Sequence, residues 1–494
     1  MSIPSGGTAG AAPPPQVRPL LPPDWRLQLD PAVRVVDDGR TLIGGSPLRI
    51  LRLSPAGASV VGRLAKGEQL GESVARRNLA RRLFDGGFAH PRPASEGERS
   101  PAPRDVTAVV PVRGHPDQLE RTLAALAGEG LAGIVVVDDC SDPADAEAIA
   151  VVAQRFGALL LRRPVNGGPA AARNTGMAAV RTPLVAFVDV DVIPEGRWLV
   201  DLLAHLADGA VSAVAPRIRS RPTDGGVRDR FERRHSPLDL GTAEARVAPR
   251  TRIAYVPTVL LVARMEAIDC AGGFDDALRF GEDVDLVWRL IAAGGTVRYQ
   301  PEAAASHAPR SSWSAWVRQR VGYGSAAAPL ARRHPGDVPP LAVSWWSVLA
   351  WGLAAAGRPV AGVTTAAAST ALLPRKLRGH VSHPFVQALR LAGWGHVLAG
   401  RWIARAVLRP WWPLAVAAAL VSRQARWAVV AAATVPALLD WDAELGIDRA
   451  RYLVLRLADD VAYGAGVWVG CWRERSIAAL LPELRSWPGR RADA

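Results

Sequence analysis

Two aspartates directly follow an apolar run near the middle of the chain. Residues 184–188 have the pattern of a buried strand, which ends in Asp189-Val190-Asp191. Side chains at positions i and i+2 of a strand point the same way. The two carboxylates can therefore share one divalent cation, Mg²⁺ or Mn²⁺, because hard cations favour oxygen ligands. Such a cation suits the diphosphate of a nucleotide donor, although an Asp-x-Asp pair by itself also fits an ordinary polar loop.

Three further features precede this pair and give it context. Pro111 and Arg113 leave the first apolar run, and Asp138 and Asp139 end the second. A carboxylate at such a strand end can accept hydrogen bonds from a uracil or a ribose. An Asn-Gly-Gly turn then leads into a helix that carries Arg173, which could reach a phosphate or a base. Each of these side chains also fits an ordinary loop or surface position, and only their order makes the set specific.

The elements that must position these residues alternate along the chain. Apolar runs predict strands at residues 106–112, 134–137, 158–161 and 184–188, with helical stretches between them, such as 116–127. This alternation predicts a parallel sheet with both faces covered by helices. In such folds the ligands bind at the carboxyl ends of the strands, which is where the candidate residues lie.

Composition narrows the class of protein and its surroundings. A chain of 494 residues is expected to form more than one domain. The formal charge is +14, and the two lysines leave 58 arginines among 60 basic residues, as expected from a GC-rich genome. Basicity therefore argues only weakly for nucleic acid; an acidic nucleotide or an anionic membrane fits as well. Three widely spaced cysteines and the lack of a signal peptide pattern favour a reducing compartment.

The chain divides into five segments by pattern. We expect a disordered tail at 1–23, a small module at 24–93, a linker at 94–104, the α/β domain at 105–335 and an apolar helical region at 336–494. In the module, a hairpin around Asp38-Gly39 precedes the alternating strand 48–53, and Ser54-Pro55 opens a helix. A second helix ends at Gly86-Gly87, and this order of strands and helices predicts a winged-helix-like unit.

The C-terminal region is apolar and rich in tryptophan and arginine. Residues 341–373 form a helical hairpin, a kinked span or a buried pair of helices, and 411–422 and 427–439 are shorter apolar runs. Tryptophans near arginines are typical of a membrane interface, so we expect attachment to the inner face of the cell membrane, with the α/β domain in the cytoplasm. The alternative is a helical accessory domain.

Together with Gly281-Glu282-Asp283, these motifs resemble the family 2 glycosyltransferases, whose fold is the Rossmann-like GT-A fold. The resemblance implies that Asp283, with Glu282 beside it, supplies the catalytic base for the acceptor hydroxyl. It also implies that Pro111, Arg113, Asp138, Asp139, Arg173 and Asp189 bind the nucleotide sugar, and that His307 joins Asp189 and Asp191 at the metal. Asp285 is expected to pair with Arg289 instead.

The domain order, and the stretch Arg320-Val-Gly-Tyr-Gly-Ser, are similar to the glycosyltransferases of mycofactocin systems, and the 24–93 module looks like a peptide-recognition domain. This implies inverting transfer of a hexose, glucose from UDP-glucose, to a peptide-derived redox cofactor or its precursor. A polyprenyl-phosphate or cell-envelope polysaccharide transferase is the alternative. A DNA-binding regulator with a winged helix is a more distant one, and we expect no nucleic-acid partner.

Overall fold

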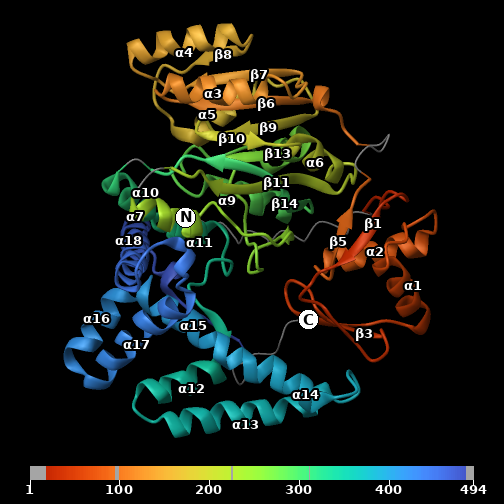
Figure 1. Ribbon diagram of the computed structural model, residues 1–494, viewed down its shortest axis with the longest axis vertical. Coiled ribbons are helices and arrows are strands. Elements are labelled where there is room, and N and C mark those ends of the chain that lie inside the picture. Colours follow the sequence, from red (N-terminus) through yellow and green to blue (C-terminus); the bar gives the residue numbers. More distant parts are fainter. Residues whose placement is uncertain (1–17, 95–99, 224–225, 311, 486–494) are drawn as a thin grey trace, which may run out of the picture.

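The computed structural model describes residues 18–94, 100–223, 226–310 and 312–485 (Figure 1). A large sheet with its helices forms one end of the molecule, and the small N-terminal unit and the C-terminal helices lie below it. Of the segments expected from the sequence, residues 1–17 of the tail and 95–99 of the linker lie outside the described residues. Residues 18–23 are packed, since Leu21 is buried and Arg18 pairs with Asp85 on the N-terminal unit at 2.7 Å.

The N-terminal unit contains the hairpin, the next strand and the two helices that the sequence predicts: β2 (Arg34–Val36), β3 (Thr41–Gly44), β4 (Arg49–Arg52), α1 (Pro55–Ala65) and α2 (Val74–Asp85). It also contains β1 (Arg26–Leu29) and β5 (Ala89–Arg92), which pair with each other and were not predicted. The β2–β3 hairpin turns at Asp37 and Asp38, which both have positive φ, and Ser54 caps α1 by accepting a hydrogen bond from Gly57 N. β4 is an edge strand of the sheet β2-β3-β4.

The main sheet has nine strands within the described residues. Its order is β10-β14-β11-β13-β9-β6-β7-β8, with β12 paired to β14. The strands are β6 (Val106–Val112), β7 (Gly133–Asp138), β8 (Leu159–Arg162), β9 (Leu184–Val188), β10 (Val192–Glu195), β11 (Val211–Ser220), β12 (Ala245–Val247), β13 (Leu260–Arg264) and β14 (Thr296–His307). The four strands predicted from the sequence are therefore β6, β7, β8 and β9.

The sheet is mixed, and the expectation of a purely parallel sheet was wrong. β6, β7, β8 and β9 run parallel, but β13 is inserted between β9 and β11 and is antiparallel to both. β10 and β12 also run antiparallel to β14. Strands and helices alternate in the first half of the sheet domain, and this alternation predicts parallel pairing. The direction of β13 depends instead on the path of the long segment before it, whose sequence has no regular periodicity.

Helices cover both faces of the sheet, as the sequence predicts. α3 (Pro116–Leu126), α4 (Pro143–Arg155) and α6 (Trp198–His205) pack on one face, and α5 (Gly168–Met177), α8 (Met265–Ala271) and α9 (Glu282–Ala292) pack on the other. Successive β6 residues face opposite layers: Ala108 and Val110 belong to the first core and Val109 to the second. The strand is buried on both sides, which explains its continuous apolar sequence.

The chain after the sheet is helical. Its helices are α10 (Trp313–Ser325), α11 (Ala327–Arg333), α12 (Trp345–Ala355), α13 (Pro359–Leu377), α14 (Pro384–Ala388), α15 (Trp394–Leu408), α16 (Trp412–Val421), α17 (Arg423–Asp440) and α18 (Arg449–Glu474). One further helix, α7 (Val227–His235), lies within the sheet domain between β11 and β12. Two short strands, β15 (Ala342–Ser344) and β16 (Glu483–Arg485), pair with each other. Residues 341–373 form the helical hairpin α12–α13, which is one of the three arrangements that the sequence left open.

α18 joins the helical region to the sheet domain through α10. A Cβ on Gly466 would lie 2.1 Å from the carbonyl oxygen of Val321, so only glycine allows the two helices to approach this closely. At the same contact the buried Arg320 of α10 forms ion pairs with Glu232 of α7 and Asp459 of α18. Three elements that are far apart in the sequence thus meet at one buried cation.

Membrane attachment through residues 341–440 was expected from the sequence. Among the described helices, none combines the length and the apolar character that crossing a bilayer requires. The longest of them, α18, carries the buried acidic pair Asp459 and Asp460 in its middle.

We predict that Arg320→Ala destabilises the whole protein, because it leaves Glu232 and Asp459 buried without their cation. Removing one partner of a buried ion pair costs about 3–5 kcal/mol in the free energy of unfolding. Arg318→Ala is the matched control, since Arg318 is exposed on the same helix. Chemical denaturation of both variants measures the difference, and equal midpoints would show that the buried ion pairs contribute no stability.

Candidate active site

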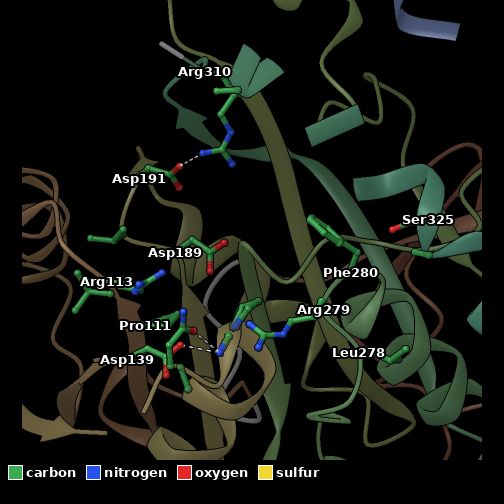
Figure 2. A pocket seen from close by; sticks show the side chains of 18 of the residues that line it. Pro111, Arg113, Asp139, Asp189, Asp191, Leu278, Arg279, Phe280, Arg310 and Ser325 are labelled. Carbon is green, nitrogen blue, oxygen red and sulfur yellow. Dashed lines mark hydrogen bonds and ion pairs between the residues drawn. The ribbon is translucent and has the colours of Figure 1, made fainter. Parts of the chain in front are cut away.

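The predicted site residues gather at the carboxyl ends of β6, β7 and β9. Pairing of Val112 with Asp138 aligns the ends of β6 and β7, and β9 lies on the other side of β6. A cavity of about 1020 Å³ opens there. Its lining includes Pro111, Arg113, Asp139, Asp189 and Asp191, which Figure 2 shows around one space.

The two neighbouring carboxylates Asp138 and Asp139 have different positions. Asp139 lines the cavity and accepts hydrogen bonds from Gly167 N at 3.0 Å and Gly168 N at 2.7 Å. It thereby anchors the glycine turn that starts α5, where Gly168 has a φ of +83°. Asp138 is buried behind the strand end, accepts hydrogen bonds from the backbone and hydroxyl of Ser141, and is not part of the described lining.

Arg173 is a buried link between two parts of the site. Its guanidinium donates to Asp189 Oδ1 at 2.7 Å and to Glu282 Oε1 at 3.0 Å. Burial disfavours the charged form of Arg173, but the two carboxylates outweigh that effect and raise its pKa. Arg173 stays charged and connects the end of β9 to the first turn of α9. In this structure it contacts these carboxylates, whereas the sequence suggested a phosphate or a base.

Asp191 points to a different partner from Asp189. His307 Nε2, at the end of β14, lies 3.0 Å from Asp191 Oδ2, and Arg310 lies 3.8 Å from the same oxygen (Figure 2). Burial favours the neutral form of Asp191, but the contacts with His307 and Arg310 hold its pKa below the usual value. β10, which follows Asp191, pairs with the end of β14 and so brings His307 to this position.

The donor chemistry at this position fits a divalent cation. An imidazole and a carboxylate already lie within 3.0 Å of each other, with the carboxylate of Asp189 two residues away. Oxygen and nitrogen ligands of this kind suit Mg²⁺ or Mn²⁺. Among the described residues, no three Asp, Glu, His or Cys side chains lie close enough together to hold a metal ion. Asp189 would have to turn from Arg173 to complete the set.

Glu282 and Asp283 begin α9 on the far side of Arg173. Burial, together with the charge of Glu282, raises the pKa of Asp283 to about 7. Burial also raises the pKa of Glu282, although Arg173 opposes this shift. A carboxyl group whose pKa is near neutral is suited to general-base chemistry. Neither residue is in the described lining of the cavity, which the preceding residues Leu278, Arg279 and Phe280 supply.

Asp285, one turn along α9, has a structural role. Its carboxylate is buried and pairs with Arg289 at 2.8 Å, as the sequence predicts, and also with His334 at 2.9 Å. Both oxygens are engaged, which makes Asp285 unsuited to receive a proton from a substrate.

Sequence reasoning missed several cationic residues of the cavity. Arg279, Arg310 and Arg473 line it together with Arg113. Arg310 follows His307 by only three residues, and this proximity was a signal that could have been used. Arg473 comes from the end of α18, and no local pattern links that helix to the cavity. These four arginines can donate hydrogen bonds to a diphosphate, and they lie among the acidic residues Asp139, Asp189, Asp191 and Glu474 of the same lining.

Comparisons with known proteins agree with this arrangement. A family model described as glycosyl transferase family 2 matches residues 107–271. The pre-mycofactocin glycosyltransferase of Mycobacterium tuberculosis (strain CDC 1551 / Oshkosh) is 42% identical over 478 residues, covering 94% of this chain and 99% of that protein. The succinoglycan biosynthesis protein ExoU of Rhizobium meliloti (strain 1021) is 30% identical over 210 residues, covering 39% of this chain and 58% of that protein. A solved mannosyltransferase from Pyrobaculum calidifontis is 20% identical with a TM-score of 0.40, covering 77% of this chain and 91% of that one.

The α/β sheet with its acidic strand ends is thus the GT-A-like fold of an enzyme that transfers sugars. The chain belongs to the family 2 glycosyltransferases, within the group that includes the pre-mycofactocin glycosyltransferase. The family resemblance seen in the sequence is confirmed. The chain is an enzyme, so the alternative of a DNA-binding regulator does not describe its function.

We predict that Asp283→Asn lowers the rate of sugar transfer by about 10²–10⁴-fold, the usual contribution of a general base. The substitution keeps the size of the side chain but removes proton acceptance, so donor affinity should stay unchanged by calorimetry. In the wild-type enzyme, kcat/KM should rise with pH through about 7, because only the ionised carboxylate accepts the proton.

The control for this prediction is Asp269→Asn, which changes an exposed aspartate on α8. It should leave both the rate and the pH profile as in the wild type. Retained transfer by Asp283→Asn would move the base to another residue, and Glu282→Gln would then be the next variant to measure.

Proposed function

We propose that this enzyme transfers a hexose, glucose from UDP-glucose, to a peptide-derived redox cofactor of the mycofactocin type or to its precursor. The main support is the similarity to the pre-mycofactocin glycosyltransferase, which covers 94% of this chain and includes both flanking regions as well as the catalytic domain. The succinoglycan relative covers only 39% of the chain, so the alternative of an envelope-polysaccharide transferase has support over less than half of it.

In the proposed reaction, the acceptor hydroxyl attacks the anomeric carbon while the bond from that carbon to the diphosphate breaks, which inverts the configuration. Asp283 accepts the hydroxyl proton, and Glu282 holds Arg173 beside it. Asp191 and His307, joined by Asp189, would hold a divalent cation, which neutralises charge on the leaving diphosphate. The arginines of the cavity, among them Arg113 and Arg279, stabilise the same group.

The three parts of the chain have separate proposed roles. Residues 105–335 bind the donor and carry out the transfer, because all of the acidic site residues lie there. Residues 24–93 recruit the peptide-derived acceptor, with β4 as the edge strand that offers backbone hydrogen bonds to an extended peptide. Residues 336–494 support the catalytic domain through α18, whose Arg473 reaches the cavity.

The identity of the donor is tested by incubating the purified enzyme with Mn²⁺ and a panel of nucleotide sugars. We expect UDP release from UDP-glucose to exceed release of nucleotide from the other donors, and expect chelation of the metal to stop it. Asp189→Ala and Asp191→Ala should each abolish transfer at saturating metal while melting normally. Near-normal turnover by either variant would rule out the proposed metal role, and preference for another donor would rule out glucose.

The role of the N-terminal module is tested by deleting residues 24–93. UDP-glucose hydrolysis should persist, whereas the KM for the acceptor should rise. The module contacts the catalytic domain, for example through Arg81 and Asp208 at 2.5 Å, so the melting temperature must be measured as well. If the module is only a structural cap, hydrolysis and transfer will disappear together with the fold.

A point variant avoids the risk of unfolding. Leu48 is exposed directly before β4, and Leu48→Glu should raise the acceptor KM about fivefold, the loss expected for an apolar contact worth about 1 kcal/mol. Val74→Glu changes another exposed apolar residue, on α2 of the same module, and should have no effect. Equal KM values for both variants would exclude this edge as the recruiting surface.

A further inference from the structure

α16 exposes an entirely apolar sequence. Its ten residues are all apolar, and none of them is buried. Leu420 and Val421 at its end are 76% and 87% exposed. A helix on the surface of a water-soluble domain normally has a polar face towards the solvent, and a contiguous exposed apolar surface marks a contact with another apolar phase. The packing of α16 against α17 leaves this surface without a partner.

The neighbouring helices extend the apolar surface. α17 has 18 residues, of which Ala437 is the only one classed as buried, and its Trp427 is 64% exposed. α15 exposes Trp402, which is 58% accessible. These helices lie between the large sheet and the α12–α13 hairpin, with α16 and α17 at the left edge of the view (Figure 1). We call the exposed side of α15, α16 and α17 the apolar face. Its large exposed side chains are Trp394, Val397, Leu398, Trp402, Leu414, Val416, Leu420, Val421, Trp427, Val430, Val435, Leu438 and Leu439.

A second cavity lies between α15, α17 and α18 and shares residues with the apolar face. Its volume is about 220 Å³, less than the 300–1,000 Å³ of an ordinary ligand pocket. Leu398 and Trp402 belong to both the cavity wall and the apolar face. The cavity is also lined by three arginines and two aspartates, Arg401, Arg405, Arg456, Asp440 and Asp460. It therefore combines apolar side chains with an excess of one basic side chain, and its volume suits a headgroup.

Two of these arginines are not neutralised by a contact. Arg401 pairs with Asp440, and Asp460 is 3.0 Å from Arg409. The side chains of Arg405 and Arg456 form no hydrogen bond or ion pair within the described residues, although Asp460 is near enough to interact electrostatically with both. The nearby charge of Arg409, together with burial, lowers the pKa of Arg405, which shows that positive charge is crowded at this point.

We propose that the apolar face lies in the surface of an anionic bilayer and that Arg405 and Arg456 bind the phosphate of one membrane phospholipid. Guanidinium groups bind phosphate oxygens with two parallel hydrogen bonds. Tryptophan side chains are favoured at the level of the lipid headgroups, and short apolar helices bind in the plane of the interface. The proposed contact is with one leaflet, and none of the described helices has the length and apolar character to cross a bilayer. The proposal is independent of the sugar and of the acceptor.

The charge of the cavity argues against a second copy of the chain as the occupant. Two copies joined through this face would bring the arginines of one cavity near those of the other in an apolar contact. An anionic lipid instead supplies the missing negative charge and apolar chains that continue along Leu398 and Trp402. The same ligand therefore satisfies both the unpaired Arg405 and Arg456 and the apolar side chains of the cavity.

The test measures sedimentation of the full chain with vesicles of phosphatidylcholine alone or with added phosphatidylglycerol. We expect binding to require phosphatidylglycerol and to weaken as the salt concentration rises. Arg405→Gln with Arg456→Gln should weaken binding about 25-fold, since each arginine near an anionic surface contributes a factor of about five. The control is Arg26→Gln with Arg49→Gln, which removes the same charge from exposed positions on the N-terminal unit.

A second pair of variants tests the apolar contact. Leu420→Glu should abolish vesicle binding, whereas Val151→Glu, at an exposed position on α4 of the catalytic domain, should not change it. Glucose transfer is measured in parallel, so that a failure of the proposed activity is distinguished from a failure of lipid binding. Melting temperatures show whether each variant remains folded.

Three results would overturn the proposal. Equal binding to neutral and anionic vesicles, unchanged in Arg405→Gln with Arg456→Gln, would exclude a headgroup site. Binding of inorganic phosphate that depends on these arginines, without any vesicle binding, would assign the cavity to a free anion. A concentration-dependent dimer that Leu420→Glu dissociates, again without vesicle binding, would assign the apolar face to a second copy.

Discussion

Arg173 is the charge on which the geometry of the active site depends. A buried guanidinium is costly unless carboxylates surround it. Here one carboxylate is Asp189, at the end of β9, and the other is Glu282, in the first turn of α9. α5, β9 and α9 are therefore fixed relative to one another. The arrangement also separates the two proposed tasks: Asp191 remains with His307 on the proposed metal side, and Asp283 remains beside Glu282 on the proposed acceptor side.

The remaining charges are arranged around this centre. Asp139 is used for local structure, because it holds the glycine turn that begins α5. The cationic groups Arg113, Arg279 and Arg310 line the cavity that we propose for the donor. Carboxylates that are already paired or hydrogen-bonded do not repel a diphosphate strongly, while Arg113 and Arg279, which form no ion pair within the described residues, attract it. This difference in pairing makes the cavity suitable for an anionic leaving group.

The C-terminal helices are coupled to the same site through α18. Glycines on α18 permit close contact with α10, and Arg320 is buried between them. At one end of α18, Arg473 lines the catalytic cavity; Arg456, which lines the proposed lipid site, is about 26 Å away along the helix at 1.5 Å per residue. Since α18 is one continuous helix, a protein docked on a bilayer through the apolar face would hold its active site at a fixed distance from the lipid surface.

The sequence by itself determined the local elements and the family. Apolar runs in the sequence located β6, β7, β8 and β9, because a buried strand needs consecutive apolar residues. The acidic residues that follow these runs pointed to Asp139, Asp189 and Asp191, because the end of a strand is where the apolar run stops. Only the tertiary structure decided which charged groups are partners. It inserted β13 antiparallel into the sheet, placed Asp138 behind the cavity, brought Arg473 into it and left α16 exposed although its sequence reads as buried. Periodicity in the sequence shows that a face of an element is apolar. Which surface covers that face, and how far apart the charges of separate elements lie, are decided only when the chain folds.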